Sequence, residues 1–229
     1  MDSRAHGASS SFPSDSHTIV GLQQRRRRSD EYRMLLDSGA SFLVHGEVVA
    51  RLRLCEGQAL DGVELDQVIR ASELTAAREK ALDLAARREH SRAELERKLR
   101  RKRFPDDAIR NALHDLEVRG IIDDRRFARL WVEARLRKRP EGRVQLVAGL
   151  LQRGVSREIA EHSVAEIYAA RETLVASALR RAAERSWRSS GGSTEAAIRR
   201  LVRRGFSFAE AREAVRALNN LEKNDFSFE

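Results

Sequence analysis

Three stretches of similar sequence stand at equal spacing along this chain: LRRKRF at 99–104, LLQRGV at 150–155 and LVRRGF at 201–206. Each begins 51 residues after the previous one. Apolar positions on both sides keep the same spacing: Leu95, Leu146 and Ala197 upstream, then Leu113, Val164 and Val215, and Leu116, Ile167 and Leu218 downstream. Matching positions in three copies at one period indicate a repeated supersecondary unit.

Each repeat reads as three short helices. In the first, residues 76–88 form a helix, SRAE at 91–94 is a capping box that opens the next one, and Pro105 suits the start of the third. Ser207 with Glu210 forms another capping box in the last repeat. We therefore predict repeats over 75–123, 124–169 and 170–220. Short helices bury a core by packing on their neighbours, which predicts an elongated array of helix-turn-helix-like units.

The composition favours helices, because Ala, Leu, Arg and Glu are abundant, aromatic residues make up 5% and the chain has 3 Pro. Residues 1–30 are rich in Ser and Arg without apolar periodicity, which predicts a disordered tail, and a second tail is expected at 221–229. Within 31–74, apolar and polar residues alternate through Tyr32–Leu36 and Phe42–Leu54, and a short helix follows. The predicted fold class is mainly α, with a small N-terminal β-hairpin segment packed against the repeats.

The formal net charge is +9 and the isoelectric point is near 10.6. Residues 31–74 hold four Arg against eight acidic residues, so the helical part carries more positive charge than the whole chain. Such a chain suits a polyanion or an acidic protein surface as partner. The single Cys55 excludes an intramolecular disulfide and fits a reducing, cytoplasmic setting. No apolar run approaches the roughly 20 residues that span a membrane, so no membrane association is expected.

The basic run KLRRKRF at 98–104 lies on the second helix of the first repeat. At 100° per residue, Leu95 and Leu99 share one face of that helix, and most of the Arg side chains point away from it. The same positions are basic in the third repeat, whereas the second repeat has Ala148 and Gln152. The residues predicted to contact a partner or DNA are Arg97, Lys98, Arg100, Arg101, Lys102, Arg199 and Arg203. Arg binds phosphate and carboxylate alike, and a solvated face remains the alternative, so the pattern alone does not choose.

Three longer stretches carry a resemblance to a known family: REHSRAELERKL at 88–99, GIIDDRRFARLWV at 120–132 and GRVQLVAGLLQRGVSREI at 142–159. They resemble the RecX family of bacterial recombination regulators. The resemblance implies tandem three-helix units that bind the RecA recombinase filament and restrain its ATPase and strand-exchange activities, within DNA repair and the SOS response. It implies no catalytic activity and no cofactor. One departure is Arg103, where the later repeats have Gly154 and Gly205 and the family usually has Gly.

The remaining side chains that suit chemistry have structural explanations. Ser91 beside His90 fits a helix cap better than a nucleophile, and Asp123 with Asp124 fits the start of a helix better than a catalytic pair. Trp131 fits a core position better than base stacking. No nucleotide-binding or metal-binding fingerprint occurs, so we expect no catalytic residue, no metal site and no enzyme.

Two hypotheses for the function remain. The first is a monomeric regulator that binds the RecA filament, close to its single-stranded or filament-bound DNA. The second is a helix-turn-helix-type module that acts directly on nucleic acid. The repeated array favours the first, because a linear series of units matches a helical polymer, whereas helix-turn-helix regulators usually carry one unit per chain and dimerise.

Overall fold

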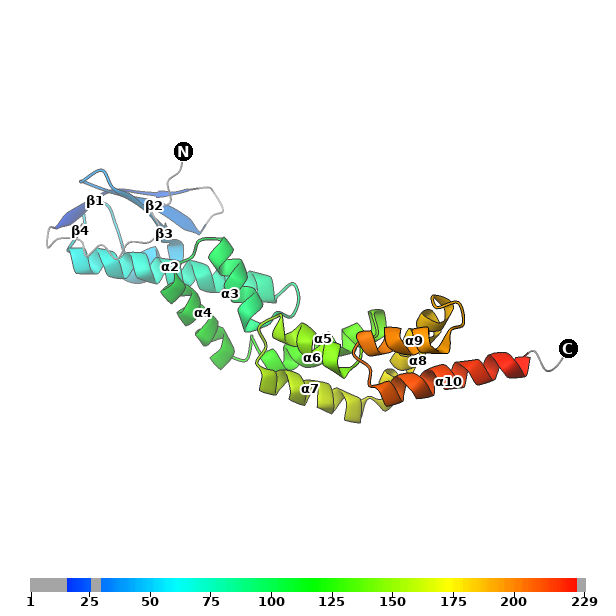
Figure 1. Cartoon of the computed structure of the whole chain (residues 1–229). Helices are drawn as coiled ribbons and strands as arrows, with labels where there is room; N and C mark the ends of the chain where they lie inside the picture. The colour runs from blue at the N-terminus through cyan, green and yellow to red at the C-terminus, as the bar shows by residue number, and fades with distance from the viewer. Residues whose placement is uncertain (1–15, 26–29, 226–229) are drawn as a thin grey trace. The chain divides into compact units, whose positions relative to one another are not determined.

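The computed structural model of the chain describes residues 16–25 and 30–225, and these are mainly helical (Figure 1). They fall into two compact units. The first runs to Ile122 without residues 91–93, and the second consists of Ser91–Ala93 and the chain from Asp123 onward. The predicted fold class, tandem three-helix repeats after a small N-terminal β segment, is confirmed. The elongated arrangement of the repeats stays a prediction.

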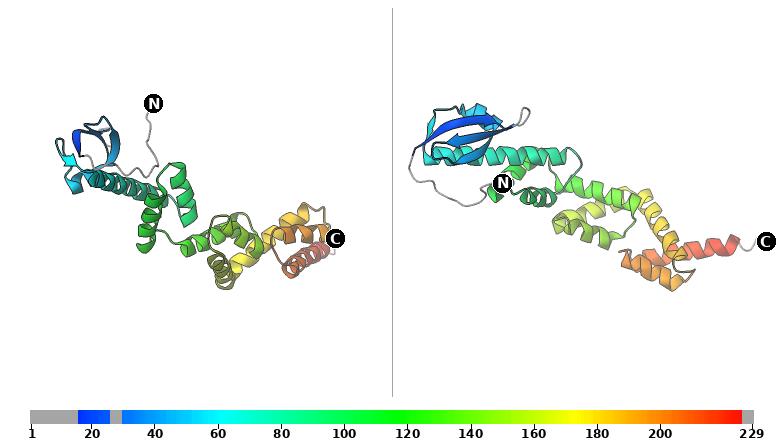
Figure 2. Two further views of the ribbon diagram at one scale, coloured as in Figure 1. Left: turned by 60° about the vertical axis from the view of Figure 1, so that its left-hand side comes forward. Right: turned by 90° about the horizontal axis from the view of Figure 1, so that it is seen from above.

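Among the described residues, the first unit opens with a four-stranded antiparallel sheet in the order β3-β2-β1-β4. Its strands are β1 (His17–Gln24), β2 (Glu31–Leu36), β3 (Ser41–His45) and β4 (Ala59–Leu60). The sheet lies along one side of helix α2 (Gly62–Ala85), as Figures 1 and 2 show. Side chains such as Ile19, Met34 and Val44 are buried between sheet and helices, as expected for a sheet with one face in the core.

Strand β1 lies in the stretch that the sequence predicts to be a disordered tail, so that prediction is wrong for His17–Gln24. The strand is missed because Ile19 is the one fully buried side chain along it, which makes the apolar alternation weak. Its order comes from pairing on both edges, with β2 on one side and β4 on the other. The expectations for residues 1–15, 26–29 and 226–229 lie outside the described residues.

A second correction concerns the residues after β3. The alternating run predicts another strand, but Gly46–Leu52 form helix α1. His45 caps the helix, since its Nδ1 accepts a hydrogen bond from the Glu47 amide at 3.3 Å. Arg53 ends it in the left-handed region, with a φ of 52°. Val48 packs into the core from this helix. An apolar position that the alternation assigned to a strand is therefore buried from a helix of two turns.

Helix α2 is longer than predicted. It runs unbroken from the short helix expected before residue 74 into the first helix of the first repeat, so the expected boundary between 74 and 75 falls inside it. Asp61 and Glu64 form a capping box at its start, and after Gly62 no Gly or Pro interrupts it. The sequence therefore lacks the stop signal that two separate helices would need.

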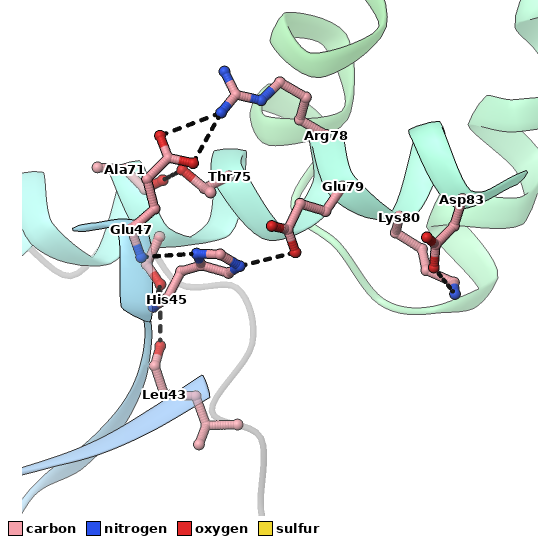
Figure 3. Close-up of polar contacts among 10 residues, drawn as sticks. Leu43, His45, Glu47, Ala71, Thr75, Arg78, Glu79, Lys80 and Asp83 are labelled. Carbon is pink, nitrogen blue, oxygen red and sulfur yellow. Dashed lines mark hydrogen bonds and ion pairs between the residues drawn. The ribbon is translucent and has the colours of Figure 1, made fainter. Parts of the chain in front are cut away.

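A polar junction, buried at His45 and Ser72, fixes the sheet to α2 (Figure 3). The His45 side chain is 5% exposed, and its Nε2 lies 2.9 Å from a carboxylate oxygen of Glu79. Its backbone amide donates to the Ser72 hydroxyl at 2.5 Å. Nearby, the Arg78 guanidinium donates to the Glu47 carboxylate at 3.2 Å. Polar pairing adds to the apolar contacts and stabilises a sheet that is too small to stand alone.

Three helical triplets follow the predicted repeats. The first joins the C-terminal half of α2 to α3 and α4, and the other two lie in the second unit. Their bounds are α3 (Arg92–Arg101), α4 (Asp106–Val118), α5 (Asp124–Lys138), α6 (Arg143–Leu151), α7 (Arg157–Ala170), α8 (Glu172–Arg188), α9 (Thr194–Arg203) and α10 (Phe208–Asp225). The second helices begin 51 residues apart, and so do the third helices. Helix α10 continues past residue 220, where the last repeat was expected to end.

Each triplet has an apolar core at the positions that recur in the sequence. The fully buried side chains of the second helices are Leu95, Leu99, Leu146, Leu150, Ala197 and Leu201. Two of the predicted caps are confirmed, whereas the capping box predicted at Ser91–Glu94 stays a prediction. The Asp123 carboxylate accepts two backbone hydrogen bonds at the start of α5, and Ser207 with Glu210 exchange the two bonds of a capping box.

The second and third triplets join through their backbones at a left-handed turn. Gly205 follows α9 with a φ of 87°, and its carbonyl accepts a hydrogen bond from the Val144 amide at 3.3 Å. One residue earlier, the Arg204 carbonyl accepts from the Gly142 amide at 2.8 Å. A Cβ on Gly142 would overlap the Gly205 carbonyl, and a Cβ on Gly205 would lie 2.6 Å from the Gln145 nitrogen. Neither position has room for a side chain.

The same turn ends the second helix of the other triplets. Within the second unit, a Cβ on Gly154 would overlap the Ala93 side chain, and the Arg153 carbonyl accepts from the Ser91 hydroxyl at 2.7 Å. In the first triplet Arg103 makes the turn, with a φ of 62°. Among the described residues, the sheet and α1 come before that triplet in place of another repeat, and Arg103 is exposed, so no close approach like those at Gly154 and Gly205 excludes its side chain. Arg103 bears only the cost of the left-handed conformation, about 1 kcal/mol.

We expect Gly205→Ala to destabilise the protein more than Gly191→Ala does. Both place Ala at a positive φ, 87° and 62°, which costs about 1 kcal/mol. Nothing lies within 4 Å of a Cβ at Gly191, whereas at Gly205 the Cβ would meet Gln145, adding about 1–3 kcal/mol from overpacking. Urea denaturation followed by circular dichroism measures the difference. Equal losses in the two variants would contradict the close approach.

Candidate functional site

The second helix of the first triplet presents basic side chains to solvent. Along α3, Leu95 and Leu99 are buried while Arg97 and Arg101 are exposed, as the helical wheel predicts. Lys102 is exposed directly after the helix. Their position leaves these side chains accessible to a partner, and the contacts themselves stay predictions.

Arg100 is exposed, but nearby acids already compensate its charge. Its guanidinium lies 2.9 Å from the Asp106 carboxylate and 2.8 Å from that of Glu96. The hydrogen bond and charge of Asp106, followed by the charge of Glu96, raise the pKa of Arg100. Arg100 is therefore a weaker candidate for a partner contact than the sequence suggests.

Lys98 does not point outward with the other basic residues of the run. Its Nζ lies 3.2 Å from Nε2 of His90, and the side chain is half-buried. Burial, followed by the charge of Arg88, lowers the pKa of Lys98. Position 98 borders the apolar stripe of α3, which lets its side chain join an internal polar cluster. The grouping of Lys98 with an exposed contact surface is therefore not supported.

His90 lies at the centre of this cluster and is 3% exposed. Its Nδ1 is 3.0 Å from the Glu94 carboxylate, which Arg88 contacts at 3.2 Å. Because Lys98 only donates, Nε2 accepts and Nδ1 carries the proton. Burial lowers the pKa of His90, so the ring is neutral at pH 7. Burial alone would raise the pKa of Glu94, but the hydrogen bond with His90 and the charge of Arg88 lower it overall.

We expect the first unit to lose stability as the pH falls below about 6.5. The folded-state pKa of His90 lies below its ordinary value of 6.5, so in this range the unfolded chain binds a proton that the folded chain does not. The contribution of His90 is complete above pH 6.5 and is lost from there down to its folded-state pKa. Urea denaturation should give a flatter profile for His90→Gln between about pH 7.5 and 5.5. The same slope in both proteins would contradict a buried neutral His90.

The third triplet holds a basic pocket between the ends of α8 and α9. Its volume is 310 Å³, and its lining residues are Arg185, Ser186, Ser189, Arg200, Arg203 and Arg204. Arg203 is a predicted contact residue, whereas Arg199 is exposed on the same helix but does not line the pocket. Sequence reasoning missed Arg185, because it stands on another helix and only the fold brings it to this place. The paired Arg residues at 199–200 and 203–204 were the available signal.

The four guanidinium groups of the pocket form no ion pair within the described part of the chain. Arg200 donates to the Ser189 hydroxyl at 2.7 Å, and Arg204 donates to the Pro140 carbonyl at 2.7 Å. Burial, followed by the charge of Arg185, lowers the pKa of Arg204. The pocket thus concentrates positive charge whose hydrogen-bond acceptors are neutral oxygens.

In the second triplet, the Trp131 ring lies at the helix position that corresponds to Arg200. Gly149 stands 51 residues before Arg200, and a Cβ there would lie 2.5 Å from the Trp131 ring. Arg153, which corresponds to Arg204, lies over the same ring, 4.6 Å from its centroid. Trp131 packs half-buried against the core of the triplet, as predicted. The triplets therefore share a backbone, and their side chains at this helix position have different surroundings.

Two further kinds of feature are absent from the described residues. Among them, no group of three or more His, Cys, Asp or Glu side chains is arranged to hold a metal ion. The helices of the described ranges are also too short or too polar to cross a membrane.

Two family models match the chain. One, described as RecX, first three-helix domain, covers residues 77–116, and the other, RecX, second three-helix domain, covers residues 123–163. The regulatory protein RecX of Chlorobaculum tepidum is 34% identical over 140 residues, which make up 59% of this chain and 84% of that protein. The chain belongs to the RecX family.

Other RecX proteins extend this relationship. The regulatory protein RecX of Chlorobium phaeobacteroides is 43% identical over 91 residues, 38% of this chain and 60% of that protein. A crystal structure of regulatory protein RecX shares the fold, with a TM-score of 0.67 at 19% identity over 88% of this chain and 99% of the other. The resemblance seen in the three quoted stretches is confirmed. RecX relatives carry the name of regulatory proteins, and the matched models end before the third triplet.

Proposed function

We propose that this RecX-family chain binds the RecA nucleoprotein filament and lowers its ATPase and strand-exchange activities, thereby regulating DNA repair and recombination. Family membership supports the regulatory role, because the relatives are named regulatory proteins. In this proposal the chain acts as a monomer through its binding surfaces and carries out no chemistry of its own.

The repeat at a fixed 51-residue period is the observation that carries the proposal. A filament presents the same surface again at every subunit, so a chain of repeated units can contact several subunits at once. Linked contacts raise overall affinity by factors of about 10²–10⁴ over single contacts. The backbone junction at Gly142 and Gly205 supports this view, because it holds the second and third triplets in a fixed orientation to each other.

Basic side chains at equal helix positions supply the contacts in this proposal. Arg97 and Arg101 of the first triplet correspond to Arg199 and Arg203 of the third, and all four are exposed. A guanidinium pairs with a carboxylate of the filament protein or with a phosphate of its DNA. The surface therefore suits either component of a nucleoprotein filament.

Direct DNA binding is the alternative function. The basic pocket of the third triplet favours it, because four guanidinium groups without a carboxylate partner attract a polyanion. The two functions are compatible, since the RecA filament carries its own DNA.

The purified chain should lower single-stranded-DNA-dependent ATP hydrolysis by RecA at substoichiometric amounts. A protein bound across several filament subunits affects more than one of them and also interferes with filament growth. A coupled ATPase assay over a range of molar ratios measures the effect. Unchanged hydrolysis at equimolar protein would refute the proposed regulation.

The combined variant Arg97→Ala/Arg101→Ala/Arg199→Ala/Arg203→Ala should fold normally and bind the filament at least tenfold more weakly. Exposed substitutions usually change stability by no more than about 0.5 kcal/mol, whereas each lost contact costs binding about 0.5–1 kcal/mol. Sedimentation with RecA on single-stranded DNA measures binding.

The control for this variant removes equal charge from exposed Arg residues that pair with an acid four residues away on their own helix. These residues are Arg70, Arg119, Arg137 and Arg157. Filament binding by this control should stay within about twofold of the original, because exposed pairs of this kind contribute little. If both variants bind at the original strength, the predicted surface is only a solvated face.

A further inference from the structure

The basic pocket of the third triplet gathers positive charge without a neighbouring carboxylate among the described residues to balance it. Four Arg side chains line it, and within the described residues none of them meets a carboxylate at ion-pair distance. Burial and then the charge of Arg185 lower the pKa of Arg204 more than the charge of Glu141 raises it, and the Glu141 carboxylate pairs with Arg135 at 2.9 Å. Like charges gathered in this way repel and cost stability. An anion from outside would complete the site.

The number of donors favours a phosphate over a carboxylate. A carboxylate is matched by the fork of one guanidinium, whereas the oxygens of a phosphate accept hydrogen bonds from several directions. Arg185 approaches from α8, and Arg200 and Arg204 approach from α9 and its end. Donors from two elements suit a group with tetrahedral oxygens, and a volume of 310 Å³ leaves room for the groups esterified to it.

The openness of the pocket favours a phosphate that belongs to a chain. The pocket is open to solvent, so it encloses only part of a ligand. A free phosphate gains most from an enclosed site, where the surrounding dielectric is low. A backbone phosphate of a nucleic acid can sit in the pocket while its neighbours extend over exposed basic side chains such as Arg199.

We propose that this pocket binds a backbone phosphate of a DNA strand, with Arg185, Arg200, Arg203 and Arg204 as the donors. The site is particular to the third triplet. In the first triplet the residue corresponding to Arg200 is Lys98, which contacts His90, and in the second it is Gly149, which contacts Trp131. The proposal does not rest on the contact with RecA, because the pocket is formed by the chain alone.

The test uses the full chain without RecA and the variant Arg185→Ala/Arg200→Ala, which leaves the proposed filament contacts intact. Fluorescence anisotropy measures its affinity for a labelled oligo(dT) of about 30 nucleotides over a range of salt concentrations. We expect affinity to fall about tenfold, with a salt slope shallower by about 0.7 for the lost phosphate contact. The thermal midpoint should stay equal or rise, because two repelling charges are removed.

The control is Arg212→Ala/Arg216→Ala, which removes the same charge from exposed positions on α10. Its affinity for the oligonucleotide should stay within about twofold of the original. Equal weakening by the two variants would overturn the proposal, since net charge alone would then explain binding. Unchanged affinity in the pocket variant would overturn it as well.

Two further ligands separate the sources of the anion. Inorganic phosphate should bind only weakly, and a poly-glutamate peptide should not compete with the oligonucleotide for the pocket. Tight binding of inorganic phosphate that depends on Arg185 and Arg200, with DNA binding unchanged, would make this a small-anion site and overturn the DNA assignment. Competition by the peptide equal to that of the oligonucleotide would assign the pocket to acidic protein instead. These measurements contain no RecA, so a failure of the proposed RecA regulation would not change their results.

Discussion

Two backbone segments meet without a side chain between them, and the second unit depends on this contact. The start of α6, at Gly142, lies against the turn after α9, at Gly205, and two backbone hydrogen bonds join them. One inserted residue in α9 would turn its end by about 100° and move the acceptor carbonyls away from their donors. The contact therefore fixes where α9 ends relative to the start of α6, whereas the first helices of the triplets differ in length.

A fixed backbone leaves the side chains of the repeats free to differ. Positions 98, 149 and 200 are equivalent in register, and each has a different surrounding. Lys98 is drawn into a cluster around neutral His90, Gly149 makes room for the Trp131 ring, and Arg200 faces an open pocket. The first position contributes a polar interior and the second an aromatic contact, whereas the third leaves its charge accessible. In our proposal, one scaffold thus supports stability in two triplets and a binding surface in the third.

The parts of the fold that rest on local chemistry are predictable from the sequence. The repeat period, the buried Leu positions of α3 and α6, and the cap at Asp123 all follow from periodicity and capping preferences. Strand β1 is not predictable in this way, because its order comes from two partner strands and not from its own pattern. Helix α1 is hidden because His45, an uncommon cap, starts it. The site divides similarly: Arg203 follows from the helical register, while Arg185 and the inward turn of Lys98 depend on tertiary contacts.

The pocket differs from other basic parts of the chain in how its positive charge is balanced. Several exposed Arg residues elsewhere have acids close by, as Arg100 has Glu96 and Asp106. Such pairs add little stability, but they keep the local field small. Within the described residues, no acid lies at ion-pair distance from Arg200 or Arg204, so a positive field persists at the pocket. An acid there would relieve the repulsion permanently and would also cancel the attraction for any anion. In our proposal, a bound phosphate relieves the same repulsion only while it is present, so the repulsion that destabilises the free protein favours phosphate binding.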